Sequence, residues 1–173
     1  TYSAVFSRYL GAMMARGHSI EYFIEGGRSR TGRLMQPKTG MLAMTVRAYV
    51  RKPVRPVVFV PIYFGYERLV EGRTYIGELS GRPKEKESVI GMLRTLPELR
   101  SRFGKVYVSF GEPLPLDDLL THHVPGWDRQ QTVTDEKPAW LSPLCTDLAR
   151  QIMARINAAA CVTPVNLLGT VLL

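Results

Sequence analysis

The chain has 173 residues, of which 23 are basic and 15 acidic, so its formal net charge is +8. This length is sufficient for a domain with its own hydrophobic core, and the basic excess favours an anionic partner such as nucleic acid, a phospholipid surface or an acidic carrier protein. Cys145 and Cys161 have neither the spacing of metal ligands nor the density of a disulfide framework, which indicates a reducing compartment and no metal site. No apolar run approaches the ~20 residues that would span a bilayer.

The elements of secondary structure follow from the spacing of apolar residues and the positions of Gly and Pro. In chain order we predict a helix (3–16), a short strand (20–25), a loop (26–37), a helix (39–51), a strand (57–64), a helix (84–101), a strand (106–110), a short helical segment (117–122), a polar surface loop (124–137) and a long helix (141–160). The run 57–64 is almost continuously apolar, which predicts a strand covered on both faces. Strands that alternate with helices favour an α/β fold.

Residues 23–33, with the sequence FIEGGRSRTGR, are the most informative segment of the chain. They follow the predicted strand and place Arg28, Arg30 and Arg33 among three glycines and two hydroxyl side chains. Glycine allows backbone N–H groups to approach an anion closely, and the guanidinium group of arginine matches two phosphate oxygens at once. The segment therefore predicts a phosphate-binding loop at the end of a strand.

Three segments in this order resemble the glycerophospholipid acyltransferases and, more narrowly, the bacterial membrane-bound glycerol-3-phosphate 1-O-acyltransferases. Residues 23–33 resemble the third conserved block of the superfamily, although Ile24 stands where most members have proline. Residues 60–67, an apolar run with a proline and a Tyr-Glu end, are similar to the fourth block, and residues 110–113 (FGEP) are common at a strand end in these enzymes. The resemblance implies a mixed sheet flanked by helices within the α/β class.

The catalytic His-x-x-x-x-Asp block of the family lies upstream of the glycine–arginine block and has no counterpart in residues 1–22. His123 and Asp128 have the same spacing, but they follow the fourth block. Pro125 and Gly126 also break the helical turn that would bring the two side chains together, so we expect a polar loop there.

The chain starts without Met and ends on an apolar run, so we expect an internal fragment of a longer enzyme that is inactive by itself. We expect residues 1–123 to be the C-terminal part of the acyltransferase domain and residues 124–137 to be a surface loop. Residues 138–173 are expected to be a helical segment that continues into a missing C-terminal region.

The resemblance implies that the enzyme transfers a fatty acyl group from acyl-CoA or acyl-carrier protein to the sn-1 hydroxyl of glycerol-3-phosphate, in the first step of phospholipid synthesis. The acyl donor is a co-substrate, and no further cofactor is implied. The family works at the cytoplasmic face of the bacterial inner membrane, so a membrane surface is the expected partner. The general base is the upstream His–Asp pair.

Within this chain we assign the phosphate of glycerol-3-phosphate to Arg28 and Arg30, with Arg33 as a further binding residue. Arginine suits this task because its charge does not titrate and its fork fixes the orientation of the phosphate. Ser29 can donate a hydrogen bond to the phosphate or shape the turn. A fixed phosphate would hold the far hydroxyl against the base.

By resemblance, Glu25 and Gly26 are catalytically essential. Glu25 has two physical explanations: it accepts a hydrogen bond from a glycerol hydroxyl or orients an arginine, or it forms a buried salt bridge that holds the loop. Gly27 and Pro61 are expected to shape the site, because a proline within a strand marks a bend or a bulge.

Two alternatives remain open at this stage. The first is acylation of another phosphorylated acceptor, such as dihydroxyacetone phosphate or lysophosphatidate. The second is a non-catalytic anion-binding module that docks on membrane or nucleic acid. We do not expect nucleic-acid binding, because the glycine–arginine block is single, lies between apolar elements and is accompanied by no nucleic-acid-binding motif.

Overall fold

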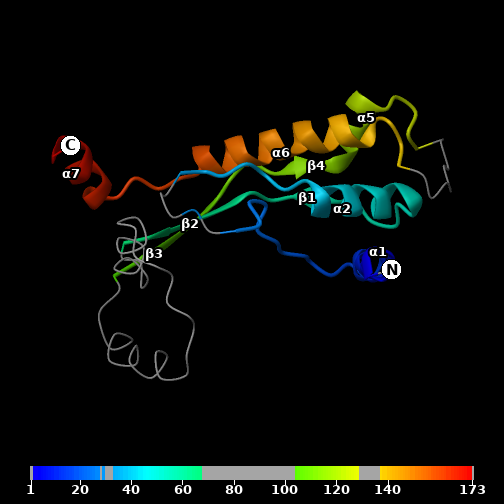
Figure 1. The fold of residues 1–173 in the computed structure, drawn as a ribbon, viewed down its shortest axis with the longest axis horizontal. Coiled ribbons are helices and arrows are strands. Elements are labelled where there is room, and N and C mark those ends of the chain that lie inside the picture. The colour runs from blue at the N-terminus through cyan, green and yellow to red at the C-terminus, as the bar shows by residue number, and fades with distance from the viewer. Residues whose placement is uncertain (1, 28, 30–32, 68–103, 129–136, 173) are drawn as a thin grey trace, which may run out of the picture. The chain divides into compact units, whose positions relative to one another are not determined.

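The computed structural model describes residues 2–27, 29, 33–67, 104–128 and 137–172 (Figure 1). Arg28, Arg30 and the helix predicted at 84–101 lie outside these residues. The chain divides into two compact units, one formed by Thr1–Ile62 with Phe110–Ala159 and the other by Tyr63–Ser109 with Ala160–Leu173.

The helices of the first unit agree with those predicted. They are α1 (Tyr2–Ala15), α2 (Gly40–Arg51), α5 (Leu116–His123) and α6 (Leu141–Ala158). Helix α2 packs against both α1 and α6, and α5 packs against α6. Helix α1 is followed by Gly17 with φ +79°, and Pro53 follows α2 closely, so each helix ends next to a residue that does not continue it.

The hydrophobic core of the first unit is formed mainly by one face each of α2, α5 and α6. Leucine dominates its largest fully buried side chains, which are Leu42, Leu116, Leu120, Leu141, Leu144, Leu148, Val46 and Cys145. Their recurrence at intervals of three and four residues in α6 is the amphipathic pattern of a helix packed on one side. Burial raises the pKa of the Cys145 thiol to about 11, so this cysteine is a packing residue.

Strands β1 (Val58–Phe59) and β4 (Leu114–Pro115) form an antiparallel pair in the first unit (Figure 1). Phe59 lies opposite Leu114 in this pair. Two residues farther along, the carbonyl of Pro61 accepts a hydrogen bond from the amide of Gly111, at 2.8 Å. From Phe59 to Pro61 the chain advances by two residues, whereas from Leu114 back to Gly111 it covers three. The extra residue forms a one-residue bulge opposite Pro61. A proline within a strand favours such an irregularity because it lacks the N–H group.

Strands β2 (Ile62–Tyr66) and β3 (Val106–Phe110) pair with each other, and nearly all of their residues belong to the second unit. At the end of β2 the amide of Glu67 donates to the carbonyl of Lys105 at 3.1 Å. The Glu67 carboxylate then accepts from the Lys105 amide and from the Tyr107 hydroxyl, both at 2.9 Å. The bond from the Lys105 amide is the main reason why the pKa of Glu67 lies below its ordinary value. Helix α7 (Pro164–Leu172) also belongs to this unit.

Helices together with small antiparallel sheets confirm the predicted α/β class. Two predictions within it are wrong. The apolar run 57–64 is not covered on both faces, because it is interrupted at Pro61 and leaves Val58, Val60 and Phe64 exposed. Residues 20–25 do not form a strand: the amide of Gly26 bonds back to the carbonyl of Phe23, which turns the chain there.

In the part of the chain that the structure describes, no helix has the length and hydropathy needed to cross a membrane.

Candidate functional site

The described ends of the glycine–arginine segment are held together, and we call residues 25–37 the arginine loop, of which 28 and 30–32 lie outside the described residues. The amide of Lys38 donates to the carbonyl of Ile24 at 2.7 Å, and Ile24 itself is buried in the core. One residue farther into the loop, Oε2 of Glu25 accepts a hydrogen bond from the amide of Met35 at 2.8 Å. These two bonds form the neck of the loop and join residues that are ten or more positions apart in the sequence.

The double glycine lies in this neck. Gly26 has φ +62°, a backbone conformation that favours glycine, and a Cβ atom at this position would lie 3.0 Å from Cγ of Lys38. A Cβ atom at Gly27 would lie 3.3 Å from Cε of Met35. Both glycines therefore allow the outgoing and returning halves of the loop to pack closely, a role that the sequence analysis did not assign to them.

The structure brings three of the predicted site residues together: Glu25, Gly26 and Gly27 all lie in the neck. Ser29 is half-buried and Arg33 is exposed. Arg28 and Arg30, to which the phosphate was assigned, are outside the described residues, so phosphate binding by this loop stays a prediction. The neck holds the ends of the segment that carries these arginines.

Pro61 lies buried at the bulge between β1 and β4. Opposite it, Gly111 has so little room that an added Cβ atom would lie 3.0 Å from the carbonyl oxygen of Arg155 and 3.3 Å from Cβ of Pro61. The glycine of the segment 110–113 is thus explained by the close approach of α6 to the bulge. Its neighbours Glu112 and Pro113 turn their carbonyls toward the guanidinium group of Arg155, which donates to both.

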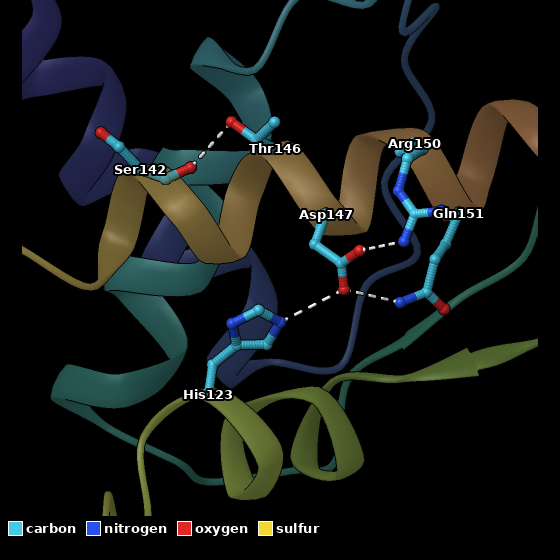
Figure 2. A network of polar contacts seen from close by, with 6 residues as sticks. All are labelled: His123, Ser142, Thr146, Asp147, Arg150 and Gln151. Carbon is cyan, nitrogen blue, oxygen red and sulfur yellow. Dashed lines mark hydrogen bonds and ion pairs between the residues drawn. The ribbon is translucent and has the colours of Figure 1, made fainter.

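His123 has an acidic partner that its spacing in the sequence does not reveal. Figure 2 shows that its ring points from α5 toward Asp147 on α6, and the Nε2–Oδ2 distance is 3.2 Å. Asp147 also accepts from Arg150 at 2.5 Å and from Gln151 at 2.9 Å. The hydrogen bonds from Arg150, Gln151 and His123, in this order of importance, lower the pKa of Asp147 to about 2. His123 therefore links two helices, and Asp128 is not its partner in this contact.

The residues that sequence reasoning missed act mostly through their main chain. Met35 and Lys38 contribute amide groups, and Glu112 contributes a carbonyl. Every residue type except proline carries both of these groups, so no side-chain pattern identifies them. Among the described residues, no three His, Cys, Asp or Glu side chains are grouped so that they could hold a metal ion.

Two families of known proteins match this chain. Residues 75–173 match the family described as the glycerol-3-phosphate acyltransferase C-terminal region, and residues 1–65 match the family described as acyltransferase. The first match alone covers more than half of the chain. The acyltransferase match ends at residue 65, within the segment 60–67 that resembles the fourth block, and the C-terminal match begins at residue 75.

Relatives with the name glycerol-3-phosphate acyltransferase are similar along almost the whole chain. The protein of Xanthomonas axonopodis pv. citri (strain 306) is 57% identical over 173 residues, which are 99% of this chain and 20% of the relative. Those of Xylella fastidiosa (strain M23) and Pseudomonas aeruginosa (strain LESB58) are 55% and 49% identical over 99% of this chain, and over 20% and 21% of their own lengths. The chain spans about a fifth of the length of the curated relatives that it matches. With both family matches and these identities, the chain belongs to the glycerol-3-phosphate acyltransferase family.

Proposed function

We propose that the protein containing this chain transfers a fatty acyl group from acyl-CoA or acyl-carrier protein to the sn-1 hydroxyl of glycerol-3-phosphate. The observation that carries the proposal is the 49–57% identity to relatives of that name along 99% of the chain. The composition of the arginine loop supports it, because a segment rich in glycine and arginine suits a small phosphorylated substrate.

In the proposed reaction, the segment 28–33 binds the substrate and the chemistry is done elsewhere. Arg28 and Arg30 hold the phosphate, and Arg33 and Ser29 assist them. A His–Asp pair outside the 173 residues takes the proton of the sn-1 hydroxyl, whose oxygen attacks the thioester carbonyl. An ester bond forms, the C–S bond breaks, and the thiol of the carrier leaves with a proton. The chain alone supplies no base and is inactive.

The setting proposed for this reaction is the cytoplasmic face of a bacterial inner membrane, where the acyl product partitions into lipid. The net charge of +8 suits an anionic membrane surface or an acidic carrier protein. The proposal involves neither nucleic acid nor a cofactor, and the acyl donor is a co-substrate.

An assay of the full-length protein tests the proposal. Purified protein in lipid vesicles is given one acyl thioester and, in separate reactions, glycerol-3-phosphate, glycerol, dihydroxyacetone phosphate or lysophosphatidate, and the position of the new ester is determined. We expect transfer to the sn-1 oxygen of glycerol-3-phosphate and little transfer to glycerol, which lacks the phosphate. Faster acylation of lysophosphatidate or dihydroxyacetone phosphate would assign a different acceptor. Transfer to none of the four would favour an anion-binding module without catalysis.

A further inference from the structure

We propose that helix α7 docks, in the full-length protein, against an apolar surface of the same polypeptide that lies outside these 173 residues. The partner is defined by its chemistry: it presents apolar side chains and contributes no ionic group to the contact. This docking depends on neither the acyl donor nor the acceptor, so it is independent of the proposed function.

Helix α7 carries an apolar stripe on one side. Its exposed large apolar side chains, which are 60–83% exposed, are Leu167, Leu168, Val171 and Leu172. At about 3.6 residues per turn, these four positions fall within an arc of about 140° around the helix axis. A stripe of this width is typical of a helix whose apolar face packs against a protein core.

The length of α7 also indicates that the helix has a partner. It has 9 residues. An isolated helix of fewer than about 12 residues is only marginally stable in water, because most of the stability of a helix in a protein comes from packing of its apolar face. A contact that covers the stripe would therefore stabilise both the packing and the helix itself.

The polar side chains at the start of α7 form hydrogen bonds within the helix. Oδ1 of Asn166 accepts from the amide of Thr163 at 2.9 Å and from its hydroxyl at 2.6 Å, and the amide of Asn166 donates to Oγ1 of Thr163 at 3.3 Å. This reciprocal arrangement resembles a capping box. The hydroxyl of Thr170 donates to the carbonyl of Asn166 at 2.9 Å. These atoms keep their partners when the helix enters apolar surroundings, which lowers the cost of burial.

The charge pattern favours an apolar protein surface over an anionic membrane surface or an acidic carrier protein. Residues 156–173 contain no Asp, Glu, Lys or Arg, whereas these residues make up 22% of the whole chain. A helix that lies on an anionic membrane surface usually carries Lys or Arg on its polar face. In α7 the side away from the stripe carries Asn166 and Thr170 instead.

The size of the stripe favours a partner within the same polypeptide over a second molecule. A stable interface between two proteins involves about 20–30 residues on each side, which is more than twice the length of α7. A surface in the same polypeptide has a high effective concentration, so a smaller contact is sufficient. Such a polypeptide exists in the relatives: the chain matches 20% of the protein of Xanthomonas axonopodis pv. citri (strain 306), so about four-fifths of that protein lies outside the match.

Photocrosslinking of the full-length protein in lipid vesicles tests the docking. Leu168 is replaced by the photoreactive amino acid p-benzoylphenylalanine, and the crosslinked peptides are identified by mass spectrometry. Thr170 is the matched control, because it is exposed on the same helix and lies about 160° around the axis from Leu168. We expect the variant at Leu168 to crosslink to an apolar peptide of the same polypeptide outside residues 1–173, with a yield about tenfold or more above that of the Thr170 variant.

Thermal unfolding of two further full-length variants tests the contact without a bulky probe. Leu168→Asp places a charge in the proposed apolar contact and should lower the Tm by about 5 °C or more. Thr170→Asp adds the same charge two positions away, on the other side of the helix, and should lower it by about 2 °C or less. Equal shifts in the two variants would contradict docking through the apolar stripe.

Each other crosslinking result would overturn the proposal and identify a different environment. A lipid adduct would place the stripe in the membrane. A crosslink between heavy- and light-isotope copies, in a mixture of both, would show self-association. A crosslinked peptide within residues 1–173 would show that this chain covers its own helix, and equal yields at Leu168 and Thr170 would show that the stripe is not covered. A protein that does not acylate glycerol-3-phosphate would contradict the proposed function but would leave the crosslinking result unaffected.

Discussion

Arg155 donates a hydrogen bond from Nη1 to the main-chain carbonyl of Pro113 at 2.6 Å. The same atom donates to the carbonyl of Glu112 at 2.9 Å. Both acceptors lie in the bulge opposite Pro61, where the irregular register removes carbonyls from the regular ladder. A side chain of α6 thus replaces the partners that a regular strand would offer.

Replacement of Arg155 by alanine should therefore destabilise the first unit by ~1–2 kcal/mol, because two carbonyls lose a charged donor. Hydrogen exchange of the α6 amides in the full-length protein would measure this loss. Arg150 is the matched control: it is on the same helix, its side chain is 76% exposed, and its ion pair with Asp147 should contribute less than ~1 kcal/mol. Equal losses for Arg155→Ala and Arg150→Ala would contradict the role given to Arg155.

Gly111→Ala tests the close approach of α6 to the bulge. The new methyl group would lie 3.0 Å from the carbonyl oxygen of Arg155. We therefore expect overpacking to lower the free energy of unfolding by ~1–3 kcal/mol. Gly40→Ala is the control, because nothing lies within 4 Å of its added Cβ atom and it begins α2. There we expect no loss or a gain of up to ~1 kcal/mol from the higher helix propensity of alanine. Thermal unfolding of the two variants compares them directly.

Alanine substitutions at Gly104 and Gly126 distinguish the cost of backbone strain from the cost of a steric collision, since both glycines have φ +77°. Nothing lies within 4 Å of a Cβ atom at Gly126. Gly126→Ala should therefore lower the free energy of unfolding only by the strain of the left-handed conformation, ~1–2 kcal/mol. At Gly104 the Cβ atom would also collide with Oε2 of Glu67, and the loss should be larger. If Glu67→Ala is added, the double variant should lose less stability than the sum of the two single variants. Additive losses would exclude the collision.

The pKa of Asp147 predicts how the link between α5 and α6 responds to acid. Its value of about 2 in the folded protein is below the ordinary 3.8, so the carboxylate stabilises the fold above pH 4. This contribution is lost as the pH falls from about 4 toward 2. Urea unfolding at several pH values should show wild type more stable than Asp147→Asn by ~1 kcal/mol at neutral pH, with the difference shrinking below pH 4. A constant difference down to pH 2 would contradict the prediction.

Arg28→Ala should raise the KM for glycerol-3-phosphate about ten- to a hundredfold and the KM for the acyl thioester far less, because it would remove the charged contact to phosphate that we propose for Arg28. Arg28→Lys should recover little, since lysine cannot bind two phosphate oxygens with one planar group. Steady-state kinetics of the full-length enzyme measure both effects. Full recovery with lysine would mean that positive charge alone is sufficient.

The helices could be predicted from the sequence because their signals are local. The spacing of Leu141, Leu144 and Leu148 gives α6, and the same kind of spacing gives α2 with Leu42 and Val46. The predicted strand at 20–25 failed for the opposite reason. An apolar run is a strand only if a partner pairs with it, and here a turn over residues 23–26 lies within the predicted strand.

The candidate site was predictable in its composition but not in its contacts. The residues of the arginine loop stand out in the sequence because glycine and arginine are chemically distinctive. The bond between Glu25 and the amide of Met35 does not stand out in the sequence, because any non-proline residue at position 35 would supply the same donor. For the same reason Asp147 could not be recognised as the partner of His123 from a separation of 24 positions.

The hydrogen bonds between Glu67 and Lys105 have a consequence for how the sequences of this family can vary. Three hydrogen bonds made by residues 67, 105 and 107 join the end of β2 to the start of β3. Two of the three bonds use the Glu67 carboxylate, whereas residue 105 contributes only main-chain groups. A relative that keeps this sheet register therefore needs an acceptor side chain at position 67, but it can carry any side chain except that of proline at position 105.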